Sequence, residues 1–262
     1  MRAWAAVFGL VVFTSLGFGQ YGPHEVVQES GDLEGITFAS ESGKVYLPIR
    51  ELGEKLRVYI GWDSDMRVPT WDEKVLMDYE TTKLPDGTNL IDVSALKRLG
   101  GKFEKVLDSQ LFTAEYNLTA VTIAIPDQWV EVNLKEQQLR AYQGKRLVLA
   151  TNISSGSRGH TTPSGEWTTG PEKSVFRRSS KYDDAPMPFS VQIFGGYFIH
   201  GSSSVPRYPA SHGCIRMPLT GINPAKYFFN WVNKGVSVRI NYSWSERMEA
   251  LMKSGDDVAE KN

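Results

Sequence analysis

The sequence predicts a small α+β domain over residues 36–125, followed by a mostly β domain over residues 126–241. Two observations carry this prediction. A strand-and-helix pattern occurs twice in the first part, and apolar and polar residues alternate along several segments of the second. The chain has 262 residues, of which 41% are hydrophobic, and this length has room for one large domain or two small ones.

The repeat in the first part consists of a short strand that runs into a short helix. Residues 45–52 form the first copy and residues 89–96 the second. A further strand signal follows each copy, over residues 58–63 and residues 103–108. The sequence therefore predicts a tandem α+β repeat, preceded by a polar, glycine-containing linker over residues 20–35.

Local signals support the two helices of this repeat. Pro48 suits a first helical turn and Asp92 an N-cap, while Ile49, Leu52 and Leu56 share one apolar face. The first copy resembles the domain family named after the N-terminal part of copper amine oxidases, through the residues Tyr46, Leu47, Pro48, Ile49, Arg50, Trp62 and Asp63. No histidine or cysteine cluster accompanies this resemblance, so copper binding is not carried over.

The second part shows the two-residue period of β-strands. Val130, Val132 and Leu134 alternate with polar residues, and residues 146–153 form another strand signal. Residues 189–193 alternate up to Gly195 and Gly196, a hairpin turn that leads into residues 197–200. The expected fold of this domain is a β-sandwich or barrel with one or two helices.

One helix interrupts the strands of the second part. Asn223 is a good N-cap, Pro224 suits the first turn, and one face is apolar, formed by Ala225, Phe228, Phe229 and Val232. A last alternating strand over residues 236–240 closes the domain. Residues 242–262 are expected to form a C-terminal helix and tail, with a capping box between Ser243 and Glu246.

The first nineteen residues have the order of a secretory signal peptide. Arg2 precedes an apolar run over residues 3–18, and Gly19 marks the expected cleavage site. An uncleaved membrane anchor is the alternative reading of this run, which is shorter than the roughly 20 residues that span a bilayer. We expect an exported protein that is located in the periplasm, or in the cell wall or extracellular space. Only this segment is expected to contact a membrane. The net charge of −1 gives no reason to expect a nucleic-acid partner.

The chain contains a single cysteine, Cys214. It cannot form an intramolecular disulfide, so in an exported protein it is either buried and inert or kept for chemistry. His212 and Arg216 flank it in a way that favours the second reading, because neighbouring cations lower the pKa of a thiol. In an extended backbone these three side chains would share one face, and Gly213 would let a carbonyl approach backbone amides that form an oxyanion hole.

A second histidine, His200, follows the predicted hairpin at a strand end. The short connection from His200 to Ser211 returns the chain beside the same strand, so a base and a nucleophile would lie on neighbouring strands. His24 and His160 have no partner in the sequence and are expected to be exposed.

These residues carry a second resemblance. Ile199-His200-Gly201 followed by Ser211-His212-Gly213-Cys214-Ile215-Arg216 resembles the signature of the L,D-transpeptidase catalytic domain. The upstream segments Ser154-Ser155-Gly156 and Thr162-Pro163-Ser164-Gly165-Glu166-Trp167 resemble a weaker pattern of the same family. The resemblance covers roughly residues 128–241. Two departures, a shorter connection after His200 and an arginine at position 216 where some members have asparagine, concern the substrate cleft and not the thiol–imidazole pair.

The resemblance implies a role for each of these residues. Cys214 is the nucleophile, His200 the general base and acid, and Gly201 supplies the carbonyl that orients the His200 ring. His212 would help to polarise the thiol. Substrate contacts are expected from the residues Arg216, Ser211, Thr162, Pro163 and Gly165.

The same resemblance implies the partners and the reaction. The expected substrates are peptidoglycan peptide stems, joined by 3→3 crosslinks through a Cys214 thioester, and carbapenem-type β-lactams are expected covalent inhibitors. No cofactor is expected, and the four histidines and one cysteine do not make a zinc ligand set. Two alternatives stay open: an L,D-carboxypeptidase that uses water as the acceptor, and a cell-wall-binding protein without catalysis.

Overall fold

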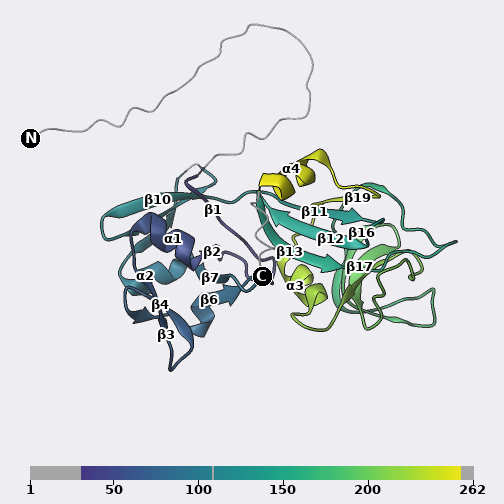
Figure 1. Cartoon of the computed structure of the whole chain (residues 1–262), viewed down its shortest axis with the longest axis horizontal. Helices are drawn as coiled ribbons and strands as arrows, with labels where there is room; N and C mark the ends of the chain where they lie inside the picture. Colours follow the sequence, from purple (N-terminus) through teal and green to yellow (C-terminus); the bar gives the residue numbers. More distant parts are fainter. Residues whose placement is uncertain (1–30, 108, 255–262) are drawn as a thin grey trace, which may run out of the picture.

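A computed structural model describes residues 31–107 and 109–254 of the chain. The expected signal peptide and most of the expected linker lie outside these residues. Figure 1 shows two lobes that lie side by side, with strands β1 to β10 on one side and strands β11 to β19 on the other. None of the described helices is both long and apolar enough to cross a membrane.

The first lobe contains three small sheets and short helices. The sheets have the strand orders β1-β10-β9-β8, β2-β7-β6 and β3-β4-β5. The strands are Leu33–Glu34 (β1), Tyr46–Pro48 (β2), Ile60–Asp63 (β3), Val68–Trp71 (β4), Lys74–Val75 (β5), Thr81–Lys83 (β6), Asn89–Asp92 (β7), Lys102–Lys105 (β8), Leu111–Tyr116 (β9) and Thr119–Ala124 (β10). The helices are Ile49–Leu56 (α1), Asp78–Glu80 (η1), Val93–Ala95 (η2) and Leu96–Leu99 (α2).

Both copies of the repeat have the expected order of strand, helix and strand. The two leading strands, β2 and β7, pair antiparallel with each other, so the copies meet at their first strands. Ile49, Leu52 and Leu56 of α1 are buried, because they lie on one helix face against the core of this lobe. Asp92 caps η2 by accepting a hydrogen bond from the Ser94 amide at 3.0 Å.

The second lobe consists of two packed sheets, with the strand orders β13-β12-β11-β19-β14 and β15-β16-β17-β18. The strands are Gln128–Asn133 (β11), Gln138–Gln143 (β12), Arg146–Asn152 (β13), Gly165–Thr168 (β14), Lys173–Arg178 (β15), Pro186–Phe194 (β16), Tyr197–Ser202 (β17), Ile215–Pro218 (β18) and Ser237–Asn241 (β19). Side chains of both sheets share one hydrophobic core with helix α3, Pro224–Trp231. The prediction of a mostly β second domain is therefore confirmed.

The two helices of this lobe cover different parts of it. The Asn223 side chain caps α3 by accepting from the Lys226 amide at 3.0 Å, as expected. Helix α4, Glu246–Ser254, begins two residues later than the expected capping box implies. Ser245, and not Ser243, provides the cap, because its hydroxyl accepts from the Met248 amide at 3.1 Å.

The two lobes share buried contacts. Phe38 packs edge-on against Tyr227 of α3, with ring centroids 5.7 Å apart. The amides of Ala39 and Ser40 donate to the carbonyls of Trp231 and Asn230 at the end of α3, at 3.2 and 2.9 Å. These contacts satisfy carbonyls that the end of a helix leaves open, so the first lobe completes the C-terminus of α3.

The last residues of the expected linker belong to the first lobe, as strand β1. Leu33 is buried, and β1 pairs parallel with β10. An apolar residue between polar neighbours gives no strand signal in the sequence, since a two-residue strand is too short to show a period.

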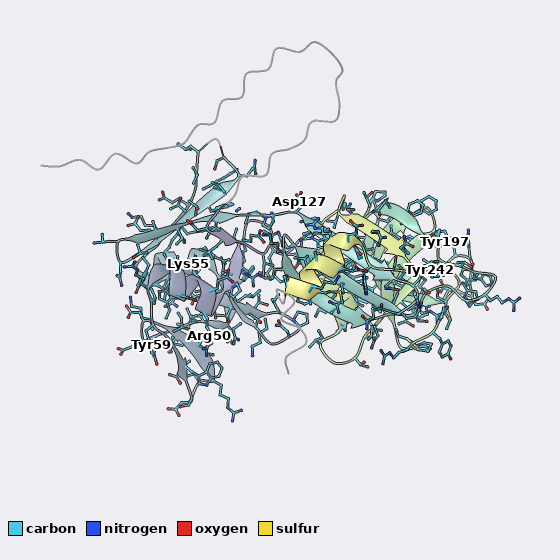
Figure 2. The ribbon with its side chains drawn as sticks, turned by 45° about the horizontal axis from the view of Figure 1, so that its top comes forward. Arg50, Lys55, Tyr59, Asp127, Tyr197 and Tyr242 are labelled. Carbon is cyan, nitrogen blue, oxygen red and sulfur yellow. The ribbon has the colours of Figure 1, made fainter. Side chains whose placement is uncertain are left out.

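Figure 2 shows the side chains of both lobes, with Arg50, Lys55 and Tyr59 labelled in the first lobe and Tyr197 and Tyr242 in the second.

Candidate active site

The predicted base lies on strand β17 of the second sheet, and the predicted nucleophile directly precedes the neighbouring strand β18. Strands β17 and β18 run parallel, with His200 opposite Arg216. The connection between them is long enough for the crossover that parallel strands need. The predicted adjacency of the His200 and Cys214 segments is thus present in the structure.

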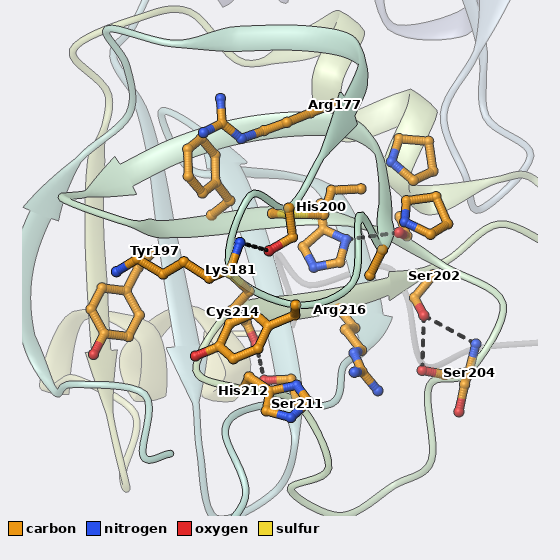
Figure 3. A pocket seen from close by; sticks show the side chains of 18 of the residues that line it. Arg177, Lys181, Tyr197, His200, Ser202, Ser204, Ser211, His212, Cys214 and Arg216 are labelled. Atoms are coloured by element: carbon orange, nitrogen blue, oxygen red, sulfur yellow. Dashed lines mark hydrogen bonds between the residues drawn. The ribbon is translucent and has the colours of Figure 1, made fainter.

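Strand alternation directs the functional side chains to one side. Ile199 and Ile215 are completely buried in the core between the sheets. Their neighbours His200, Cys214 and Arg216 face the other way and line a cavity of about 570 Å³. Figure 3 shows these three side chains around the same cavity.

His200 lies within β17 and not at its end, because the strand continues to Ser202. Its side chain is buried, with 6% of its surface exposed. Ring atom Nδ1 lies 2.8 Å from the carbonyl oxygen of Gly201. A carbonyl accepts only, so Nδ1 carries the proton and Nε2 is left as the basic nitrogen.

The surroundings of the pair keep both groups neutral. Burial lowers the pKa of His200 to about 4; the charge of Arg216 adds to this effect, and the bond to Gly201 opposes it. Burial raises the pKa of the Cys214 thiol, against the opposing effects of the Phe198 amide and two arginine charges. At neutral pH the resting state is therefore a thiol and a neutral imidazole that line the same cavity.

The chain around Cys214 is a bend and not the extended segment that we expected. Gly213 has φ +115°, a conformation that favours glycine, and a Cβ on it would lie 2.8 Å from the Tyr197 ring. Its amide donates to the Ser211 hydroxyl at 3.0 Å, so this amide is not free for the predicted oxyanion hole. Ser211 in turn donates to the Cys214 carbonyl at 2.5 Å. The bend is held by its own hydrogen bonds.

Four of the five predicted substrate-binding residues do not present an accessible side chain to the cavity. Thr162, Pro163 and Gly165 do not line the cavity, and Ser211, although at its wall, is 1% exposed. The Thr162 hydroxyl donates to the Gly213 carbonyl at 2.7 Å and accepts from the Gly156 amide at 2.8 Å. Thr162 therefore supports the nucleophile bend from behind. The motif thus pointed to a residue that stabilises the bend. A sequence motif alone does not distinguish such a structural residue from one that contacts the substrate.

The predicted thiol-polarising residue, His212, is exposed and lines the cavity. Its ring stacks on Tyr182 and meets the edge of His160, whereas the Cys214 Sγ donates to the Gly196 carbonyl at 3.8 Å. Tyr182 and His160 were not among the expected site residues. Both belong to loops without a motif, so only the fold brings them to the nucleophile segment.

The cavity lining is cationic. Arg177, Lys181 and Arg216 line it, and no aspartate or glutamate of the described chain does. Arg177 pairs with Glu172 outside the cavity, whereas Arg216 has no carboxylate partner among the described residues. Such a site attracts carboxylate-bearing ligands. In the part of the chain that the structure describes, no three histidine, cysteine, aspartate or glutamate side chains lie close enough together to hold a metal ion.

A thiol and a neutral imidazole that line one cavity, with the imidazole oriented by a backbone carbonyl, are the parts of a cysteine-dependent acyltransferase. The family comparison agrees with this class. Residues 127–240 match the YkuD model, the L,D-transpeptidase catalytic domain. The second lobe is therefore similar to the L,D-transpeptidase catalytic domain over residues 127–240.

Solved structures include several with related domains. An L,D-transpeptidase from Xylanimonas cellulosilytica is 30% identical, over 45% of this chain and 61% of that one, with a TM-score of 0.38. An E. faecium L,D-transpeptidase catalytic domain acylated by ertapenem is 28% identical, over 44% of this chain and 98% of that one, with a TM-score of 0.36. An L,D-transpeptidase from Mycobacterium smegmatis is 12% identical, over 80% and 94%, with a TM-score of 0.39.

This chain covers 61%, 55% and 53% of the first three solved relatives, so it spans only part of their length. The comparison with curated proteins gave no match.

Proposed function

We propose that this protein is an exported peptidoglycan L,D-transpeptidase that forms 3→3 crosslinks. In the first step the Cys214 sulfur attacks the carbonyl carbon of the third, L-centred residue of a tetrapeptide stem. His200 Nε2 takes the thiol proton and passes it to the nitrogen of the terminal D-alanine as the C–N bond breaks. A thioester and free D-alanine result.

In the second step an amine from a neighbouring stem attacks the thioester. His200 takes a proton from this amine, the C–S bond breaks, and the thiol regains its proton. The product is an amide between the third residues of two stems, and the protein returns to its starting form.

The observation that carries the proposal is the meeting of Cys214 and His200 in one cation-lined cavity of an L,D-transpeptidase domain. A D-alanine that leaves a tetrapeptide carries a C-terminal carboxylate. The guanidinium of Arg216, which has no carboxylate partner in the described part of the chain, is suited to this group, since arginine binds carboxylates with two parallel hydrogen bonds. Lys181 and Arg177 add positive potential to the same cavity.

The neutral resting forms of His200 and Cys214 suit this mechanism. A neutral imidazole can accept a proton, and a protonated thiol reacts slowly with other electrophiles before a substrate is bound. The thiolate forms as the imidazole takes its proton, next to Arg216 and Arg177, whose charges favour it. A carbapenem presents a strained carbonyl to the same sulfur, and we expect it to acylate Cys214.

The proposal also includes export of the protein and a role for the first lobe. Arg2 and the apolar run over residues 3–18 support export to the periplasm or cell wall. We propose that the first lobe supports and positions the catalytic domain, and its resemblance to the copper amine oxidase N-terminal-like family remains part of this proposal.

The proposal is tested with purified cell-wall sacculi and a muropeptide profile. We expect dimers linked between third residues, and free D-alanine in equal amount, with the wild type and neither with Cys214→Ser. Tripeptide monomers without dimers would indicate that water is the acceptor and that the protein is an L,D-carboxypeptidase. Binding to sacculi without any new product would indicate a wall-binding protein.

A further inference from the structure

The cavity wall opposite Cys214 comes from one hairpin, formed by β15, residues 179–185 and β16. Ser179, Lys181 and Tyr182 of the hairpin tip line the cavity together with His212 and Cys214. The tip is mostly exposed, and residues 180–185 lie at the surface. The position of this tip decides how far the cavity is closed.

Hydrogen bonds hold the tip only to itself. The Ser179 amide donates to the Ala185 carbonyl, and the Ala185 amide to the Tyr182 carbonyl, both at 2.9 Å. Arg178 binds Asp184, its neighbour across the turn. Within residues 31–107 and 109–254, every hydrogen bond of the tip has its partner in the same hairpin. Contact with the nucleophile segment must come from side-chain packing.

That packing is a cluster of three rings from three separate loops. The Tyr182 ring stacks on His212, with centroids 4.3 Å apart and planes 20° apart. His160 meets His212 edge-on at 4.9 Å and 69°, and Tyr182 edge-on at 6.4 Å and 88°. His212 therefore contacts both rings, two residues before Cys214, and His160 lies at the side of the Tyr182–His212 stack.

We propose that Tyr182, His212 and His160 form a clasp that closes the hairpin over a bound donor peptide, with Tyr182 as a positioning residue. Tyr182 acts through His212, and His160 packs against both of these rings. The clasp holds the Lys181 segment of the hairpin beside the cavity that contains Arg216, where the substrate carboxylate is expected. The identity of the donor peptide rests on the proposed function, whereas the ring contacts of the clasp do not depend on it.

The clasp depends on the ring of Tyr182 and not on its hydroxyl, because both ring contacts are packing contacts. Tyr182→Ala should raise the KM for a tetrapeptide donor by roughly 10-fold, the size expected for the loss of an aromatic pair, with kcat for acylation within about 3-fold. Tyr182→Phe should keep KM within about 2-fold of the wild type. Tyr242→Ala, at an exposed tyrosine outside the cavity, is the matched control.

Alkylation of Cys214 by iodoacetamide separates the clasp from general damage to the site. This reagent is small and neutral and needs no closed hairpin, so Tyr182→Ala should react as fast as the wild type or faster. Slower alkylation together with reduced kcat would show that Tyr182 is merely structural. An unchanged KM in Tyr182→Ala, or a Tyr182→Phe variant as impaired as Tyr182→Ala, would also overturn the proposal.

Proton NMR of the His212 ring tests the clasp without any substrate. Stacking on Tyr182 should shift the His212 ring protons upfield, and the shift should disappear in Tyr182→Ala and persist in Tyr182→Phe. Equal shifts in the wild type and Tyr182→Ala would show that the rings do not stack. If the shift is present but the wild type does not react with any donor peptide, the clasp stands and the proposed function fails.

Discussion

The Nδ1 of His200 lies 2.8 Å from the carbonyl oxygen of Gly201, the next residue along the same strand. The contact fixes the ring and leaves Nε2 as its basic nitrogen, on a side chain that lines the cavity with Cys214. Because the imidazole is buried, its pKa is lowered to about 4. The proposed base is thus neutral, and able to accept a proton, over a wide range of pH.

This relationship predicts the acid limb of the reaction. The rate of carbapenem acylation should stay high as the pH falls through 6.5 and should decline with a midpoint near 4, where His200 becomes protonated. Stopped-flow measurements across pH 3.5–8 check this range. A midpoint near the ordinary histidine value of 6.5 would mean that His200 is not the base or is more solvated than the structure indicates. His212→Ala should leave the midpoint in place.

The same pKa predicts a pH dependence of stability. The folded state holds His200 with a pKa near 4 and the unfolded state near 6.5, so between these values the unfolded state binds more protons. Stability from this group is fully present above about pH 6.5 and is lost as the pH falls toward 4, by up to about 3 kcal/mol. Denaturant unfolding at pH 7 and pH 5 should show a smaller difference for His200→Gln than for the wild type. Equal differences would contradict a buried, neutral His200.

His200→Gln also tests the catalytic role. Glutamine keeps part of the hydrogen bonding but cannot carry the proton, so acylation should slow on the order of 10²-fold or more. Because the side chain is buried, a loss of stability is also expected, and the rate must be compared at a temperature at which both proteins are folded. Near wild-type acylation by the glutamine variant would assign the base role to His212.

Thr162 holds the nucleophile bend from behind. Thr162→Val removes the donor to the Gly213 carbonyl and the acceptor for the Gly156 amide, both of which are buried. The unfolding free energy should fall by about 1–3 kcal/mol, and the acylation rate should fall as well because Cys214 shifts. Thr162→Ser keeps the hydroxyl and should restore the rate. If valine lowers stability without any change in rate, the bend does not depend on this contact.

Substitution of Phe38 tests whether the contact between the two lobes stabilises the catalytic domain. It is buried against Tyr227 and Tyr46, so Phe38→Ala should lower the unfolding free energy by roughly 3 kcal/mol or more. The loss should appear in the unfolding of the catalytic domain, followed by tryptophan fluorescence in a background in which Trp62 and Trp71 of the first lobe are replaced by phenylalanine. Tyr59→Ala, at a side chain that is 73% exposed, is the control and should have little effect. A catalytic domain that unfolds as in the wild type after Phe38→Ala would show that the first lobe only tethers it.

The sequence predicted much of this fold because its strands and helices carry local signals. The alternation of Val130 and Val132, the Gly195-Gly196 turn and the cap at Asn223 each depend on neighbours in sequence. The bend at Gly213 was not predicted, since one of the contacts that stabilise it, the hydrogen bond from the Thr162 hydroxyl to the Gly213 carbonyl, joins distant segments. The cap at Ser245 was missed for a similar reason, because its hydroxyl also binds Glu131 of β11.

The candidate site shows the same division. Cys214, His200 and the Gly201 contact lie in short motifs, so the sequence pointed to them. Burial of His200 depends on the packing of β17 between its neighbours and has no local signal. The rings of Tyr182 and His160 reach His212 only through the fold, and the absence of carboxylates from the cavity is a property of the assembled wall.

The measurement that tests the central claim most directly is the intact mass of the protein after reaction with a carbapenem, followed by peptide mapping. The wild type should gain the mass of one carbapenem, and the modified peptide should contain Cys214. Cys214→Ala should gain none, while its circular dichroism and melting temperature match those of the wild type. No adduct on the wild type, or the same adduct on Cys214→Ala, would contradict the assignment of Cys214 as the nucleophile.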